Sequence, residues 1–235
     1  FFKIMNILVL GLSSIFNKRV KASLEKIKLI RNIDCASLSK KKSDFVSSKA
    51  RDFYNSYEMA LKKSNAQLVY ITVRNNDHLN LIKKALKKNK HVIVDKPSVL
   101  NYNDALEIFN IAKKKKLCIS EAIVYQYHPQ INQIKSLFKE QNSKVKNISV
   151  IFSMPGFDQS NFRYFKKYGG GAILDLGPYA MSLGSVIFDS ELISCKGYKF
   201  YQSNFEIETS FSISQLFKPP PKKKYPLWVR YCISI

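Results

Sequence analysis

The first half of the chain alternates short aliphatic runs with longer segments of helical periodicity. Five apolar runs begin near residues 7, 33, 68, 92 and 117, and stretches with apolar positions at helical spacing separate them. Strands that alternate with helices of this length form βαβ units and a parallel sheet. We therefore expect an α/β domain over residues 1–122, a doubly wound Rossmann sheet, in which residues 45–65 contribute two helices joined near residues 54–57.

The pattern changes after residue 122. A helical pattern follows Pro129, residues 145–152 alternate as a strand, and the glycine triplet at 169–171 leads into an apolar helix that ends near Phe188. Residues 192–217 again show the alternation of strands, in which every second side chain lies on the same face. This order predicts a second, α+β domain over residues 123–235 with a mainly antiparallel sheet.

The turn after the first strand is a candidate dinucleotide site. The usual fingerprint is G-x-G-x-x-G, with glycines for the turn, for the approach of the pyrophosphate and for helix packing. Here only Gly11 is present, and Ser13 and Phe16 stand at the other two positions. A serine can still donate to phosphate, and the helix start offers free N–H groups, whereas Phe16 must displace the helix or point elsewhere. The expected cofactor contacts are Gly11, Ser13, Ser14 and Ile15.

The end of the second strand bears on the choice of cofactor. An NAD site places an acidic residue there to hold the ribose 2′-hydroxyl. This chain reads Ser37-Leu38-Ser39-Lys40-Lys41-Lys42 instead. Hydroxyls and cations suit a 2′-phosphate, so we predict that Ser37 and Lys40 contact NADP, with NAD as the alternative cofactor. An ordinary basic loop is the competing interpretation.

A third feature is the strand His91-Val92-Ile93-Val94, which ends in Asp95-Lys96-Pro97. Pro97 stops the strand because proline cannot donate into a sheet ladder. Asp95 and Lys96 are therefore expected at the carboxyl end of a buried strand, where ligands bind in open α/β sheets. Taken alone, the pair is more typical of a surface ion pair.

Two stretches together resemble the glucose–fructose oxidoreductase / inositol dehydrogenase (Gfo/Idh/MocA) family of NAD(P)-dependent oxidoreductases. Asp95-Lys96-Pro97 is similar to the family's Glu-Lys-Pro with a shorter acid, and residues 169–179 are similar to its glycine triplet followed by Asp, Gly and His-or-Tyr. Further similar segments are Asn75-Asn76-Asp77-His78, Tyr127-His128-Pro129 and Asn161-Phe162-Arg163. The likeness covers about residues 6–217. It implies hydride transfer between a nicotinamide cofactor and a secondary hydroxyl or carbonyl of a sugar, sugar nucleotide or polyol.

The resemblance also implies catalytic roles for Lys96, Asp175 and Tyr179. Tyr179 matches the acid/base position, Lys96 would bind the substrate oxygen, and Asp175 would orient the substrate hydroxyl or Lys96. A tyrosine pKa of about 10 is high for a base, and a nearby ammonium would lower it. Asp175 and Tyr179 are four residues apart and would share a helix face; Pro178 between them suggests that the helix begins there or is kinked.

The remaining site residues also follow from the resemblance. Substrate contacts are expected from Lys96, His128, Arg163, Asp175 and Tyr179 in a cleft between the domains. A packing histidine, a loop-capping arginine and a half-buried helix tyrosine are the structural alternatives for His128, Arg163 and Tyr179. The further cofactor contacts are Asn75, His78, Asp95, Lys96 and Pro97.

Composition limits the other partners. The formal net charge of +22 admits a nucleic-acid ligand, but the lysines are scattered over the polar faces of helical patterns, so we expect no specific nucleic acid. No apolar run reaches the roughly 18 residues that a membrane span needs, and the four cysteines match no metal-ligand spacing. We expect a cytoplasmic protein without a bound metal. The family also pairs through the open face of the C-terminal sheet, which implies a homo-oligomer.

The C-terminal stretch departs from the family pattern. Three prolines, residues 219–221, and three lysines, residues 222–224, follow Phe217, and prolines cannot continue a central strand. We therefore expect that the prolines end the strand that reaches Phe217 and that the second domain is incomplete through truncation or a frameshift; a short but genuine variant with a divergent tail is the alternative. Together with the altered glycine fingerprint, this motivates an alternative function, that of a catalytically inactive dinucleotide-binding remnant or sensor.

Overall fold

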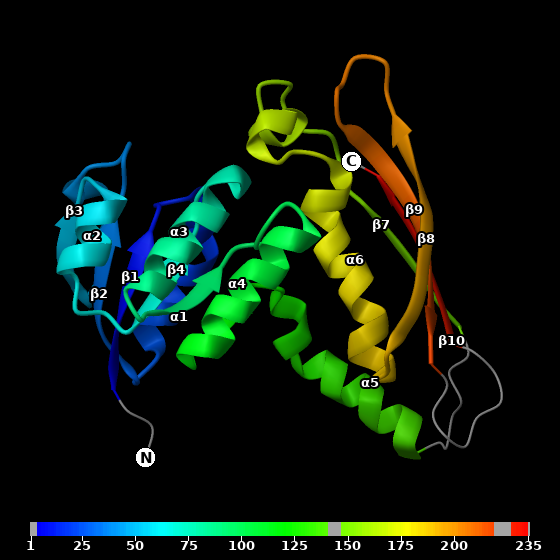
Figure 1. The fold of residues 1–235 in the computed structure, drawn as a ribbon, viewed down its shortest axis with the longest axis horizontal. Coiled ribbons are helices and arrows are strands. Elements are labelled where there is room, and N and C mark those ends of the chain that lie inside the picture. The colour runs from blue at the N-terminus through cyan, green and yellow to red at the C-terminus, as the bar shows by residue number, and fades with distance from the viewer. Residues whose placement is uncertain (1–3, 141–146, 219–226, 235) are drawn as a thin grey trace. The chain divides into compact units, whose positions relative to one another are not determined.

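The computed structural model describes residues 4–140, 147–218 and 227–234. The chain divides into two compact units, Phe1–Ala122 and Ile123–Ile235, which appear in Figure 1 in blue to green and in green to red. We call them the first and the second unit and describe each by itself.

The first unit is built on a six-stranded parallel sheet. Its strands lie in the order β3-β2-β1-β4-β5-β6. This is the order of the doubly wound dinucleotide-binding fold, in which the strand order reverses between β1 and β4. The Rossmann prediction is therefore confirmed. The strands are β1 Met5–Leu10, β2 Ile30–Ala36, β3 Ala50–Tyr54, β4 Leu68–Ile71, β5 His91–Val94 and β6 Ile119–Glu121.

Helices bury both faces of this sheet. Leu8 and Leu10 of β1 belong to one apolar cluster together with Leu81 and Ile82 of α3, whereas Ile7 and Val9 belong to a second cluster on the other face. A strand that is covered on both sides reads as a continuous aliphatic run, which is why β1 was recognisable in the sequence. The helices are η1 Phe16–Val20, α1 Lys21–Lys26, η2 Lys42–Asp44, α2 Tyr57–Lys63, α3 Asn75–Lys87 and α4 Tyr102–Lys115.

The prediction of a helix in the first part of residues 45–65 is wrong. Residues 50–54 form the edge strand β3, which pairs in parallel with β2 through Cys35 opposite Phe53 and Ala36 opposite Tyr54. Phe45 and Phe53 pack into the apolar cluster under this edge. Burial and strand pairing thus outweigh the weak local helix preference. The second helix predicted in this region is present as α2.

The second unit packs the long helix α6 on a four-stranded sheet. The strand order is β7-β10-β9-β8, in which β8–β9 and β9–β10 are antiparallel and β10–β7 is parallel. Phe211, Ile213 and Phe217 of β9 pack with Leu176 and Ala180 of α6 (Figure 1, orange strand and yellow helix). The α+β prediction is confirmed. The elements are η3 Val124–Tyr127, α5 Pro129–Glu140, β7 Asn147–Ser153, η4 Phe162–Tyr164, η5 Lys166–Tyr168, α6 Ala172–Phe188, β8 Leu192–Tyr201, β9 Glu208–Phe217 and β10 Leu227–Ser234.

The sheet contains one strand after the prolines that the sequence pattern did not predict. The three prolines lie outside the described residues, but Leu227–Ser234 forms β10 in the interior of the sheet, between β9 and β7. The eight residues Leu227–Ser234 contain no proline, and their backbone pairs with β9 on one side and with β7 on the other.

Candidate functional site

The turn after β1 is packed tightly against the end of β4. Gly11 has a φ of +101°, and a Cβ atom there would collide with the carbonyl oxygen of Thr72. Its N–H donates to Ala36 O at 2.8 Å, so the turn also contacts the end of β2. Both the positive φ and the close approach require glycine. The turn lies at the point where the strand order reverses, which is where dinucleotides bind in this fold.

Ser13 shapes the beginning of the following helix. Its Oγ lies 2.5 Å from Thr72 Oγ1 and accepts the Phe16 N–H at 3.0 Å, which is the geometry of an N-cap. Ser14 and Ile15 in the first turn are exposed to solvent. The backbone of this turn is therefore accessible to an anion. Sequence reasoning missed Thr72, because its contact with Ser13 joins residues 59 positions apart.

Phe16 points away from the turn and into the core. Its side chain is completely buried, and its ring centroid lies 6.1 Å from that of Tyr70 in β4. The helix adapts by starting with a π-helical turn, in which Lys21 N–H donates to Phe16 O five residues back. The third glycine position of the fingerprint is thus filled by an aromatic side chain in the layer between helix and sheet.

The loop after β2 presents lysines to solvent. Ser37 is buried, and its Oγ accepts the backbone N–H of Lys40 at 3.1 Å. The side chains of Lys40 and Lys41 are exposed. Ser37 therefore shapes the loop, and Lys40 is the predicted residue with an accessible cation.

The turn after β5 is anchored from both neighbouring strands. Asp95 Oδ1 accepts the Tyr70 hydroxyl at 2.5 Å, and Glu121 at the end of β6 accepts the Ser98 N–H at 2.7 Å. Lys96 is half-buried, and its peptide bond to Pro97 is cis. Asp95, Lys96 and Pro97 thus lie at the carboxyl edge of the sheet, as the strand pattern predicted.

His78 lies beneath this edge. The side chain is fully buried, with Nδ1 2.8 Å from Pro97 O and Nε2 3.2 Å from Val73 O. His78 connects the end of β4 to the turn after β5. Any effect of its side chain on a bound cofactor would therefore be indirect, through the positions of these two backbone segments. Asn75 opens α3 as its first residue, and Arg74 occupies the N-cap position.

The glycine triplet lets the start of α6 approach Arg163 and Glu208 closely. A Cβ on Gly170 would collide with the Arg163 carbonyl, and a Cβ on Gly171, whose φ is +113°, would lie 2.6 Å from Glu208 Oε1. The same Glu208 oxygen accepts the Ile173 N–H at 3.0 Å. The carboxylate of β9 thus satisfies one free donor of the helix and complements its dipole. No local sequence signal indicated Glu208, which lies 35 residues away.

Asp175 and Tyr179 both lie on α6, one turn apart. The helix begins at Ala172, so the possibility that it begins near Pro178 is wrong, and Pro178 lies in the helix interior. Asp175 is 7% exposed, and its Oδ2 accepts Arg163 Nε at 3.0 Å. The arginine in turn lies over aromatic rings, with Cζ 4.9 Å from the Phe157 centroid and 4.7 Å from that of Phe162.

Tyr179 lies among aromatic side chains of the same unit. Its ring centroid is 6.4 Å from that of Tyr125 and 6.3 Å from that of Phe152. The Tyr125 hydroxyl is 2.8 Å from Ser182 Oγ, and burial raises the pKa of Tyr125. His128 is exposed, and its Nδ1 accepts the Gln130 N–H at 3.2 Å, so the neutral ring carries its proton on Nε2.

The predicted site residues therefore form two groups. The group in the first unit follows the carboxyl edge of the parallel sheet, and the group in the second unit joins Arg163 to Asp175 with Tyr179 one turn further along α6. Within the described ranges, no three or more His, Cys, Asp or Glu side chains gather in a way that could hold a metal ion. Among the same residues, no helix has the length and apolar character needed to cross a bilayer.

Comparison with known proteins identifies relatives of the chain. A 3-reductase of dTDP-3,4-didehydro-2,6-dideoxy-alpha-D-glucose from Actinomadura kijaniata is 27% identical over 137 residues, which are 58% of this chain and 41% of that protein. D-xylose 1-dehydrogenase (NADP(+)) 2 from Haloferax volcanii is 26% identical over 130 residues, 55% of this chain and 40% of that protein. The chain thus matches less than half the length of these curated relatives.

Solved structures share the fold. A 3-ketoreductase from Actinomadura kijaniata in complex with NADP and TDP-benzene superposes with a TM-score of 0.80 at 21% identity, covering 97% of this chain and 70% of the other. The WlbA dehydrogenase from Chromobacterium violaceum, in complex with NADH and UDP-GlcNAcA, gives a TM-score of 0.81 at 18% identity, covering 99% and 67%. At these identities the likeness establishes the fold alone.

A family model matches the first unit of the chain. The model of the Gfo/Idh/MocA oxidoreductase family, NAD-binding Rossmann fold, matches residues 5–123, just over half of the 235 residues. The matched range contains the six-stranded sheet, the Gly11 turn and the Asp95-Lys96-Pro97 turn. The chain therefore belongs to the Gfo/Idh/MocA family of oxidoreductases, with which its sequence motifs agree.

Proposed function

We propose that this chain transfers a hydride between a nicotinamide cofactor, preferably NADP, and a secondary hydroxyl or carbonyl of a sugar, sugar nucleotide or related polyol. The observation that carries the proposal is the Gly11 turn at the reversal of strand order, in a chain of this oxidoreductase family. The names of the relatives support it, since they include sugar-nucleotide reductases, a xylose dehydrogenase and dihydrodiol dehydrogenases.

The carboxyl edge of the first unit fits a dinucleotide. Gly11 lets the chain pass close to Thr72, and the exposed first turn at Ser14 and Ile15 offers backbone N–H groups for a pyrophosphate. Lys40 is exposed beyond β2, where an adenosine 2′-phosphate would be held. We assign Asn75 and residues 95–97 to the remaining cofactor contacts, with Ser13, Ser37 and His78 shaping the backbone that makes them.

The cofactor, when bound, would accept or supply the hydride. In the oxidative direction, the substrate C–H bond breaks with its electron pair leaving as hydride, and the hydroxyl proton passes to the phenolate oxygen of Tyr179 as the C=O bond forms. Lys96 binds the substrate oxygen. Asp175, held by Arg163 through its Oδ2, orients the substrate hydroxyl or Lys96, and His128 contributes a further polar contact. The reductive direction reverses these transfers.

Cofactor binding is the first test. The purified chain is titrated with NADPH and NADH and followed by fluorescence and thermal shift. We expect micromolar binding of NADPH and at least tenfold weaker binding of NADH. Lys40→Ala should weaken NADPH binding about tenfold and leave NADH binding unchanged, whereas Lys62→Ala, an exposed lysine on α2, should change neither. Equal affinities for both cofactors would refute the NADP preference.

The catalytic assignment is tested by a double-mutant cycle. Lys96→Met and Tyr179→Phe should each slow turnover over a panel of sugars, diols and sugar nucleotides at least about a thousandfold, and Tyr179→Phe, at a residue that is not among the proposed cofactor contacts, should leave NADPH affinity within about twofold. Residues that act in one catalytic unit give strongly non-additive losses, so the double variant should be no slower than the slower single variant. An active Lys96→Met enzyme would remove the proposed mechanism.

One observation favours the alternative of an inactive dinucleotide-binding protein. Two of the three glycine positions of the fingerprint are taken by Ser13, whose hydroxyl caps the helix, and by the buried Phe16. NADPH binding without turnover of any substrate in the panel would establish this alternative. Failure of a folded chain to bind either cofactor would refute both functions.

A homo-oligomer through the C-terminal sheet remains a prediction. The sheet carries exposed apolar side chains, among them Ile151 on β7 and Tyr198 on β8. Light scattering of the purified chain tests it: a Tyr198→Ser variant should shift a dimer toward monomer, and a monomeric parent chain would contradict the prediction.

A further inference from the structure

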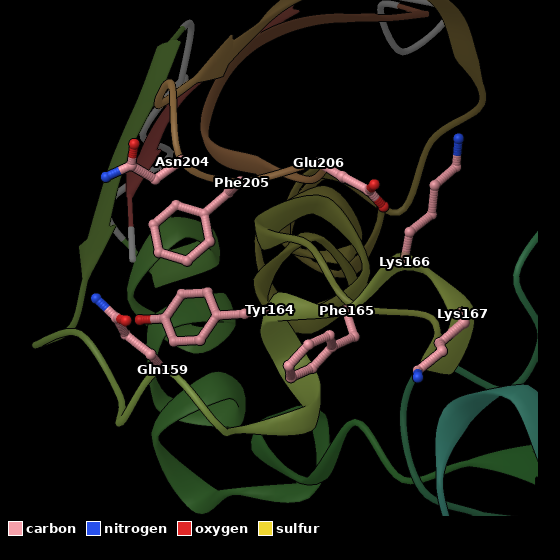
Figure 2. A pocket seen from close by; sticks show the side chains of 8 residues that line it. All are labelled: Gln159, Tyr164, Phe165, Lys166, Lys167, Asn204, Phe205 and Glu206. Atoms are coloured by element: carbon pink, nitrogen blue, oxygen red, sulfur yellow. The ribbon is translucent and has the colours of Figure 1, made fainter.

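The second unit contains a pocket that none of the assigned site residues line. It lies between the segment of η4 and η5 and the connection from β8 to β9, and its volume is about 430 Å³. This falls within the range of about 300 to 1,000 Å³ that is typical of small-molecule sites. Figure 2 shows the lining side chains, which are Gln159, Tyr164, Phe165, Lys166, Lys167, Asn204, Phe205 and Glu206.

One end of the pocket is aromatic and carries amides. The rings of Tyr164 and Phe205 are stacked, with centroids 4.7 Å apart and planes 23° apart. The Tyr164 hydroxyl accepts the Phe157 N–H at 2.8 Å, which fixes its position. In Figure 2 the amides of Gln159 and Asn204 lie at the same end as this ring pair. A flat ring with donors and acceptors on its edge can stack on such a surface and bond to the amides.

The other end of the pocket is cationic. Lys166 and Lys167 lie there, away from the stacked rings, and the carboxylate of Glu206 lies between the two ends (Figure 2). Lys167 Nζ is 5.8 Å from the Phe165 centroid and 5.0 Å from that of Tyr168. Lysine ammonium groups bind phosphates as point charges, and a carboxylate can accept the two hydroxyls of a ribose.

The pocket is connected to the start of α6. Tyr164 directly follows Arg163, whose side chain holds Asp175, and Glu206 lies two residues before Glu208, whose carboxylate accepts the Ile173 N–H. A ligand in the pocket would thus be bound by the same two segments that position the proposed catalytic face of α6.

We propose that this pocket binds the nucleoside diphosphate part of a sugar nucleotide, with the base at the Tyr164–Phe205 stack, the ribose at Glu206 and the phosphates at Lys166 and Lys167. The inference rests on the proposed function and narrows its substrate class from sugars in general to nucleotide-linked sugars. It is carried by the order of aromatic, acidic and basic side chains along one pocket.

The test is calorimetric binding of UDP, TDP and inorganic pyrophosphate to the whole chain, without any sugar. NADPH at saturation is present in a parallel series, so that a nucleotide cannot occupy the cofactor site. We expect at least one of the two nucleotides to bind at least tenfold more tightly than pyrophosphate, with or without NADPH. The double variant Lys166→Ala/Lys167→Ala should weaken the nucleotide about tenfold or more, whereas Lys196→Ala/Lys199→Ala, two exposed lysines of β8, should have no effect.

A second variant tests the aromatic end. Phe205→Leu keeps an apolar side chain but removes the flat aromatic face. It should weaken nucleotide binding about tenfold and leave pyrophosphate binding unchanged. Circular dichroism is used to check that the variant is folded. No nucleotide binding at millimolar concentration, or nucleotide binding that is unchanged in both pocket variants, would overturn the inference. If NADPH binding and turnover of a free sugar persist in that case, the proposed function survives alone.

Discussion

The buried ion pair between Asp34 and Arg51 offers a quantitative test of the first unit. Asp34 lies in β2 and is completely buried; Arg51 lies in the edge strand β3 and keeps 28% of its side-chain surface exposed. Asp34 accepts Arg51 Nε at 2.8 Å and Nη2 at 2.5 Å, and the Ser64 hydroxyl at 2.6 Å. The hydrogen bond to Asp34 raises the pKa of Arg51, so the guanidinium is charged at neutral pH.

Arg51→Met removes the counter-charge and two of these donors but keeps an unbranched apolar stem. Removing one partner of a buried pair costs about 3 to 5 kcal/mol, because the remaining charge stays desolvated. Since Arg51 is partly exposed, water can reach part of the vacated space, and we expect the lower value, about 3 kcal/mol. Arg31→Met, at an exposed position of the neighbouring strand β2, is the matched control and should cost less than about 0.5 kcal/mol.

The assay is urea denaturation combined with hydrogen exchange of peptides from β2 and β3, which reports on the first unit separately. Adding Asp34→Asn to Arg51→Met removes the buried charge and should recover part of the lost stability. If Arg51→Met lies within about 1 kcal/mol of the Arg31 control, or the double variant is no more stable than Arg51→Met, the pair does not have the burial and energetic role argued from the structure.

Three further predictions follow from local geometry. Gly11→Ala combines a left-handed φ, which costs about 1–2 kcal/mol, with a collision between the new Cβ and the Thr72 carbonyl oxygen. It should destabilise the first unit by at least about 2 kcal/mol in urea and abolish NADPH binding. The control is Gly156→Ala, where φ is ordinary and the nearest contact is 3.3 Å; it should cost less than about 1 kcal/mol. Glu208→Ala removes an acceptor from the start of α6 and should cost about 1 kcal/mol in thermal unfolding, and the exposed Glu206 serves as the control for the same change. Burial lowers the pKa of Lys90 from its usual 10.5. As the pH rises, the folded state therefore releases this proton before the unfolded state does, and the free energy of unfolding should rise as the pH approaches 10.5. A Lys90→Met variant measured in parallel should lack this rise.

Much of the fold could be predicted because burial leaves a strong mark on the sequence. The strands β1, β4 and β5 are covered on both faces and read as aliphatic runs. The edge strand β3 reads Ala-Arg-Asp-Phe-Tyr, and its two charged residues obscure the strand pattern. Arg51 can lie partly buried there because it pairs with Asp34 of β2, a contact that the sequence does not reveal. The strand β10 was concealed by the prolines that precede it.

The candidate site was only partly predictable for a similar reason. Gly11, Lys96, Asp175 and Tyr179 stand in local motifs, and the structure places them at the carboxyl edge of the sheet and on α6. The contacts that fix them are long-range. Thr72, which meets Ser13, and Glu208, which meets the start of α6, approach their partners only through the folded sheets. No spacing in the sequence reports such contacts.

The position of β10 has a consequence for the order in which the chain can fold. In the described sheet, β7 pairs with no strand other than β10, and Asn147 lies opposite Trp228, 81 residues later. The hairpin of β8 and β9 can form as soon as its own residues leave the ribosome, but β7 cannot pair until β10 has been made. Closing so large a loop is slow compared with forming a hairpin. During synthesis, β7 therefore has neither edge paired within the described sheet until β10 has been made.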